Sequence, residues 1–155
     1  MRESPALRHE ITSFFSNRFG VPVNWLDGLA FTEKDHEIWA ASAPCPEALH
    51  SKRPSGLRIA RRAPRGLKPT SVFLATLGTR ISSSRIPLDA TTLHTVLMGQ
   101  RVPLENQSDG YVALVYGNDV LGCGQVHAGL LRALIPTGRR RELLALLSKL
   151  TQTSI

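Results

Sequence analysis

Arginine is the residue type whose distribution along this sequence most clearly suggests a chemistry. Residues 48–88 carry nine basic groups, seven of them arginines, and no carboxylate. Residues 127–155 carry five basic groups and one acid, whereas residues 1–47 and 89–126 each have a net charge of −3. Guanidinium groups pair bidentately with phosphate and stack on bases. Segregated positive charge within a net charge of +7 therefore favours a polyanionic partner. Nucleic acid fits better than a membrane, because the central block lacks the apolar face of an interfacial helix.

Groups for catalysis or metal binding are scattered. Five histidines show no metal-ligand spacing with each other or with the two cysteines, Cys45 and Cys123. The "APC" triplet that ends at Cys45 resembles the active-site triplet of RNA cytosine-5 methyltransferases. However, the chain has no glycine-rich turn to hold S-adenosylmethionine, so we interpret Cys45 as an ordinary loop or core cysteine. The serines at 82–84 lack elbow glycines and indicate a plain turn. We expect no catalytic residue, metal or cofactor.

The bulk composition indicates a globular protein. With 155 residues, 42% hydrophobic and 20% charged, the chain suits one ordinary domain or two small ones. It contains no apolar run long enough to span a bilayer, and its first residues lack the apolar core of a signal peptide. Two distant cysteines without such a signal favour reduced thiols. We therefore expect a cytoplasmic location and no membrane contact.

The first half of the sequence predicts a mixture of helices and strands. Ser4 as N-cap, the following proline and Gly20 as terminator delimit a helix. The segments "LAFTE" and "EIWAAS" predict a hairpin that turns at Lys34-Asp35. Further along, "LRIARR" predicts a strand and "PRGLKPT" a turn, and "SVFLATLG" favours a helix over a buried strand. "SSSRIPLD" is expected to be extended.

The second half predicts a helix followed by short strands. Asp89 is a suitable N-cap for a helix that Gly99 ends. "YVALVYG" and "VLGCGQVHAG" predict a hairpin turning at Asn118-Asp119. Gly122 and Gly124 share one face of the second strand, where another backbone can approach closely. "LLRALIP" follows as a strand, "TGRR" as a basic turn and "RELLALLSKL" as an amphipathic helix.

The order of motifs in the second half resembles the PUA domain, a small β-barrel RNA-binding module. The similarity runs over about residues 89–140, from "ATTLHTVLMGQRV" to "GYVALVYGNDVLGCGQV". In such domains a helix and a glycine-containing loop precede the RNA-binding edge, and Gly99-Gln100-Arg101 occupies that place. The family's "LG.G" element matches residues 121–124.

The next segment, "GLLRALIPTGRR", is similar to the end of the PUA-like domain in RsmF-type RNA cytosine-5 methyltransferases. Arg132 keeps the first cation of that pattern, Pro136 and Gly138 stand in place, and Arg139 or Arg140 closes it. Two positions, 133 and 137, depart from the pattern. The first half looks like a pre-PUA domain, with "SSSRIPLDATTLHTVLMGQRVPL" at the junction. These resemblances predict an α+β fold, with a pre-PUA-like α/β domain over residues 1–88 and a PUA-type β-barrel with a C-terminal helix over residues 89–155.

Together, the charge pattern and the resemblance predict a non-catalytic RNA-binding protein. Its partner would be ribosomal RNA or tRNA, during ribosome assembly or on ribosomal particles. A module serving a separate RNA cytosine-5 methyltransferase is an alternative, and an adaptor using the C-terminal helix is a third. We expect the two basic blocks to form one cationic surface. The predicted RNA-binding residues are Arg58, Arg61, Arg62, Arg65, Lys68, Arg80, Arg85, Gly99, Gln100, Arg101, Arg132, Arg139, Arg140 and Arg141.

Overall fold

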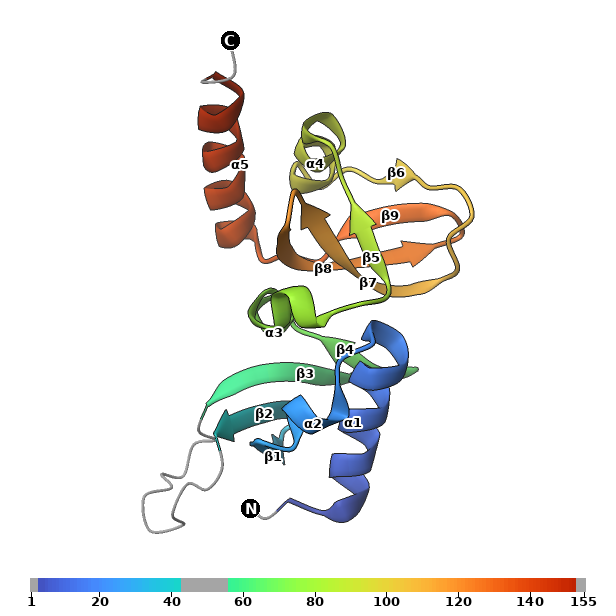
Figure 1. The fold of residues 1–155 in the computed structure, drawn as a ribbon. Coiled ribbons are helices and arrows are strands. Elements are labelled where there is room, and N and C mark those ends of the chain that lie inside the picture. The colour runs from blue at the N-terminus through green and yellow to red at the C-terminus, as the bar shows by residue number, and fades with distance from the viewer. Residues whose placement is uncertain (1–2, 43–55, 153–155) are drawn as a thin grey trace. The chain divides into compact units, whose positions relative to one another are not determined.

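A computed structural model of the chain describes residues 3–42 and 56–152, in two compact units (Figure 1). The N-terminal unit spans residues 1–83 and the C-terminal unit residues 84–155. Each unit combines helices with one sheet, so the predicted α+β class is confirmed. The sequence placed the boundary at residues 88/89, five residues later than the division in the structure. The difference arises because the segment 85–87 pairs with a strand of the C-terminal unit.

The N-terminal unit is a four-stranded antiparallel sheet with helices. Its strands lie in the order β1-β2-β3-β4. Along the chain its elements are α1 (Pro5–Phe19), α2 (Val23–Leu26), β1 (Leu29–Lys34), β2 (Glu37–Ser42), β3 (Leu57–Ala63), β4 (Gly66–Pro69), α3 (Ser71–Leu77) and the short 3₁₀ helix η2 (Gly78–Arg80).

Helix α1 begins and ends where the local sequence predicts. The Ser4 hydroxyl accepts a hydrogen bond from the Leu7 N–H at 3.0 Å, and proline occupies the first turn. Gly20 closes the helix at φ +66°, in the left-handed region that favours glycine. The buried side chains are Leu7, Ile11, Phe15 and Phe19. Their four-residue spacing makes one buried stripe along the helix.

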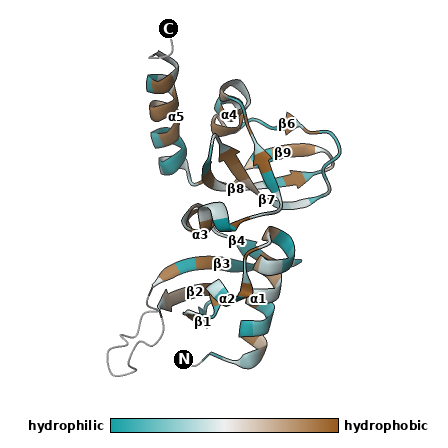
Figure 2. Cartoon of the chain, viewed as in Figure 1, coloured by the Kyte–Doolittle hydropathy of each residue, from teal (hydrophilic) through white to brown (hydrophobic). Residues whose placement is uncertain are grey.

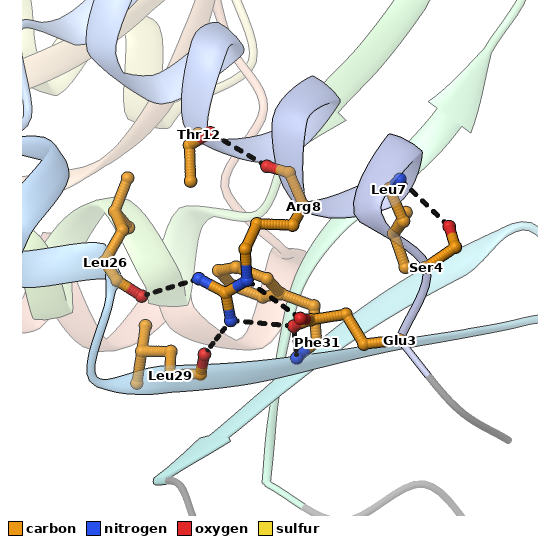
Figure 3. A network of polar contacts seen from close by, with 8 residues as sticks. All are labelled: Glu3, Ser4, Leu7, Arg8, Thr12, Leu26, Leu29 and Phe31. Carbon is orange, nitrogen blue, oxygen red and sulfur yellow. Dashed lines mark hydrogen bonds and ion pairs between the residues drawn. The ribbon is translucent and has the colours of Figure 1, made fainter.

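A network of polar contacts fastens the start of α1 to β1 (Figure 3). The Arg8 guanidinium donates to both Glu3 carboxylate oxygens at 2.8 Å and to the Leu29 carbonyl. Glu3 also accepts the Phe31 N–H at 2.8 Å. Partial burial opposes ionisation of Glu3, but the hydrogen bonds from Arg8 and Phe31 outweigh it and hold the pKa of Glu3 below its ordinary value.

Two turns of this unit differ from the sequence-based expectation. The β1–β2 hairpin turns at Asp35-His36 rather than Lys34-Asp35, because a two-residue turn needs positive φ at both positions, here 53° and 67°. Most of the segment predicted as a turn, "PRGLKPT", forms β4, which pairs with β3. The predicted helix over "SVFLATLG" is confirmed as α3, with Thr70 as its N-cap. The predicted connection around Cys45 lies outside the described residues.

The C-terminal unit is a curled, half-barrel sheet with two helices. The strands lie in the order β5-β7-β8-β9-β6, and β5 runs parallel to β7 while the other pairs are antiparallel. Along the chain its elements are β5 (Arg85–Pro87), α4 (Ala90–Leu97), β6 (Val102–Pro103), β7 (Gly110–Tyr116), β8 (Asp119–His127), β9 (Leu130–Ala133) and α5 (Thr137–Gln152). Its core includes Val96, Leu97, Leu114, Val126, Leu131, Leu143 and Leu147.

The structure confirms the predicted start of α4 and corrects two other expectations. Asp89 caps α4 by accepting a hydrogen bond from the Thr92 N–H at 2.7 Å. This hydrogen bond lowers the pKa of Asp89 below its ordinary value. The β7–β8 hairpin turns at residues 117–118, one residue earlier than predicted, because glycine takes the positive φ of 61° there. The predicted basic turn "TGRR" forms the first turn of α5. Gly138 therefore lies in the first turn of a helix.

Candidate nucleic-acid interface

The sheet of the N-terminal unit has one face toward the helices and one face away from them. Phe31 marks the helix side, because its ring lies 4.9 Å below the Arg8 guanidinium of α1. Cross-strand pairing places Ala40 opposite Phe31 and Ala60 opposite Ile38. All four of these side chains are buried. This face therefore belongs to the hydrophobic core of the unit.

The other face, which we call the open face, carries polar and basic side chains. Strand register places the side chains in two adjacent rows, namely Thr32, Trp39 and Arg58, and then Lys34, Glu37, Arg61 and Lys68. None of the seven is buried, in contrast to Phe31, Ile38, Ala40 and Ala60 on the core side. Four cations thus share this face with one carboxylate.

Three of the predicted RNA-binding residues lie on the open face, namely Arg58, Arg61 and Lys68. Arg58 pairs with Glu37 at 2.7 Å while about half of its side chain stays exposed (49%). Arg61 is exposed directly opposite Lys68 on the neighbouring strand. Arg65 is exposed in the turn between β3 and β4. Hydrophilic residues interrupt the hydrophobic ones along β3, as Figure 2 shows. This arrangement can contact successive phosphates of a polyanion.

Arg62 is placed differently from its neighbour in sequence. Its guanidinium points to the helix side and donates to both oxygens of Glu33, at 2.5 and 2.9 Å, and of Glu10, at 2.8 and 2.9 Å. The hydrogen bonds with Glu33 and then Glu10 raise the pKa of Arg62, and Arg62 in turn lowers the pKa of Glu33. Arg62 ties β3 to α1 and β1. We therefore interpret it as a structural residue rather than an RNA contact.

Arg80 does not join the open face either, and Arg85 belongs to the C-terminal unit. Arg80 in η2 is exposed, with its guanidinium 4.9 Å above the ring of Trp25. Trp25 contacts Phe73 of α3, and Phe73 contacts Phe15 of α1, so Arg80 lies on the helix side of its unit. Arg85 is half-buried in β5 of the C-terminal unit.

In the C-terminal unit, two predicted segments come together where α4 ends and α5 begins. The Arg140 guanidinium donates to the Leu97 carbonyl at 3.5 Å and to the Thr137 hydroxyl at 3.1 Å. Arg140 thereby supplies a positive charge at the C-terminus of α4. Gly99 lies against it with φ +88°, and a Cβ there would be 3.1 Å from Arg140 Nη1.

We call this region the α4–α5 edge, formed by Gly99, Gln100, Arg101, Arg139, Arg140 and Arg141. Arg101, Arg139 and Arg141 are exposed, and Arg139 pairs with Glu142 at 2.9 Å. The first turn of α5 is correspondingly hydrophilic (Figure 2). The edge therefore combines a glycine-containing loop with three exposed guanidinium groups.

Arg132 lies apart from the α4–α5 edge. Its neighbour Leu131 points into the core with α4 and α5, so Arg132 points to the opposite face of β9. There it donates to the Gln125 side chain at 3.0 Å, in a row that continues to Tyr111 on β7. Burial raises the pKa of Tyr111 above its ordinary value.

Residues for other chemistry are dispersed. Within residues 3–42 and 56–152, no group of three His, Cys, Asp or Glu side chains is placed to bind a metal ion. His127 and Asp109 lie 3.5 Å apart at an exposed hairpin end, and Cys123 is buried. No helix in the described ranges combines the length and apolar character needed to cross a membrane.

Some residues of the open face were not among the RNA-binding residues predicted from the sequence. Trp39 lies there beside Arg58, and Lys34 beside Glu37. Because side chains in a strand alternate between its two faces, the two-residue spacing of Glu37 and Trp39 in "EIWAAS" indicates that they share a face. The sequence does not show whether that shared face is the exposed one, because this depends on which face of the sheet the helices cover.

Comparison with known proteins finds a family match for one region of the chain. Residues 83–141 match the family model of the methyltransferase RsmF PUA domain. No curated protein matches the chain. The C-terminal region is therefore PUA-like and resembles that of RsmF-type methyltransferases, which confirms the predicted resemblance. The matched model describes a PUA domain rather than a catalytic domain.

Proposed function

We propose that the chain is a non-catalytic RNA-binding protein of the cytoplasm that binds structured ribosomal RNA, in ribosome assembly or on the ribosome. The observation that carries the proposal is that Arg58, Arg61 and Lys68 lie together on the open face of the sheet. None of these three side chains is buried. The PUA-like character of residues 83–141 supports it independently, because PUA domains are RNA-binding modules. The pre-PUA-like nature of the N-terminal unit remains part of this proposal.

The direct test is the salt dependence of RNA binding. If about 4–6 phosphates are neutralised, the log–log slope of affinity against salt concentration is steeper than about −3. The variant Arg61→Ala should weaken binding to all sequences alike and reduce the slope by about 1, as for a phosphate contact. A slope near zero, measured by fluorescence anisotropy with a ribosomal RNA hairpin, would contradict the proposal.

A second candidate function is a targeting module for a separate RNA cytosine-5 methyltransferase. The match of residues 83–141 to the RsmF PUA domain favours it. Copurification of the chain with a methyltransferase core would support this function. Co-sedimentation with ribosomal particles in cells that lack such a core would instead support the first function.

A further inference from the structure

We infer that the open face holds an unpaired nucleotide of the bound RNA, with its base stacked on Trp39. The inference rests on the proposed function and adds to it the part of the RNA that this face takes. It predicts a site for single-stranded RNA, whereas cations alone would contact any polyphosphate.

The position of Trp39 within the sheet is the first argument. Trp39 lies in β2, an inner strand, with Thr32 opposite it on one side and Arg58 on the other. Residues directly opposite on neighbouring strands have Cβ atoms about 5 Å apart. The indole therefore stands among short or flexible side chains, and it is only partly covered. A large aromatic side chain in such a place is a suitable platform for a base.

The surrounding charge is the second argument. Arg58 lies beside the indole, and Arg61 and Lys68 lie in the adjacent row. Among the seven side chains that the described strands place on this face, Glu37 is the one carboxylate, and it is already paired with Arg58 at 2.7 Å. An aromatic platform flanked by a line of cations is the arrangement that binds single-stranded nucleic acid, since the base stacks while the cations contact its phosphates. A protein partner would bring its own acids to such a face, and it is an alternative outcome of the test below.

The two tryptophans of the chain provide a matched pair of reporters. Trp25→Phe leaves Trp39 as the only tryptophan, and Trp39→Phe leaves Trp25, which lies on the helix side near Phe73. Each full-length variant is titrated with a single-stranded uridine 12-mer and with a 12-base-pair RNA duplex. We expect the single strand to quench Trp39 fluorescence and to leave Trp25 fluorescence unchanged. Quenching of Trp25 alone would overturn the inference.

Affinity supplies a second readout. Trp39→Ala should lower the affinity for the uridine 12-mer by about 5- to 100-fold, the range expected for loss of one stacked base. Trp39→Phe should retain affinity within about 3-fold, because a phenyl ring also stacks. Both variants should bind the duplex as wild type does, since phosphate contacts remain. If Trp39→Ala impairs folding, the phenylalanine variant and the fluorescence titration decide the question.

The outcomes separate this inference from the proposed function. A chain that binds the duplex but not the single strand would refute the site at Trp39 and leave the proposed function intact. Binding of neither RNA would refute both. Unchanged affinity of a folded Trp39→Ala variant for the 12-mer would refute the site alone, and capture of an acidic protein at this face in place of RNA would do the same.

Discussion

Replacement of Arg62 by alanine should destabilise the N-terminal unit by about 2 kcal/mol at pH 7. The guanidinium makes two bidentate ion pairs, with Glu10 and with Glu33, and all four donor–acceptor distances lie between 2.5 and 2.9 Å. The three side chains are 33%, 40% and 30% exposed, respectively. Solvent therefore screens each pair, and we assign about 1 kcal/mol to each, between exposed and buried values.

The loss should appear as a lower melting temperature. In a unit of this size, about 2 kcal/mol corresponds to a decrease of roughly 10 °C. Circular dichroism melts of the full chain would measure it. The matched control is Arg61→Ala, which removes the same side chain from the open face of the same strand. We expect that control to melt close to wild type, within about 0.5 kcal/mol.

The penalty should also depend on pH. Arg62 holds the pKa of Glu33 below its ordinary value, so the stability that this pair contributes is fully present above about pH 4.3. It is lost as the pH falls through the lowered pKa of folded Glu33. The difference in melting temperature between wild type and Arg62→Ala should therefore narrow between pH 5 and pH 3.

RNA affinity should respond to the two variants in the opposite way to thermal stability. Arg61→Ala should weaken RNA binding without destabilising the unit, and Arg62→Ala should destabilise it without weakening binding by the folded protein. An Arg62→Ala variant that melts with wild type at pH 7 would refute the structural role assigned here. Equal losses of RNA affinity in both variants would refute the separation of the two faces.

Three glycines give further predictions for the C-terminal unit. Gly99→Ala should cost about 1–2 kcal/mol in urea unfolding, because φ is +88° there and the new Cβ would meet Arg140. Gly138→Ala, in the first turn of α5 with open space around it, should instead stabilise by about 0.5–1 kcal/mol, and equal effects of the two changes would contradict this account. Gly124→Ala should cost about 1–3 kcal/mol, because its Cβ would lie 2.7 Å from the Leu114 side chain. A double variant with Leu114→Ala should show coupling between the two sites, and strict additivity would count against direct contact.

Local signals in the sequence predicted the helices well. Ser4 and Gly20 bound α1, and Asp89 caps α4, because capping depends on a side chain and the few backbone groups next to it. The positions of the turns were predicted less accurately. The hairpin at Asp35-His36 requires positive φ at two residues that carry side chains, and the pairing of the strands selects them. Residues 137–140 form a helical turn, in which Arg140 contacts the end of α4, a segment distant in sequence.

The amino-acid sequence was sufficient to show that positive charge is concentrated in residues 48–88 and that the C-terminal half is PUA-like. Which arginines share a face became clear from the folded sheet. Strict alternation along β3 would place Arg58 and Arg62 on one face and Arg61 on the other. The register shift at Ile38/Trp39 instead inserts one extra residue in β3, so Arg58 and Arg61 share the open face and Arg62 faces its carboxylates. One extra residue reverses the facing of every later side chain in the strand, and such a bulge depends on the partner strand.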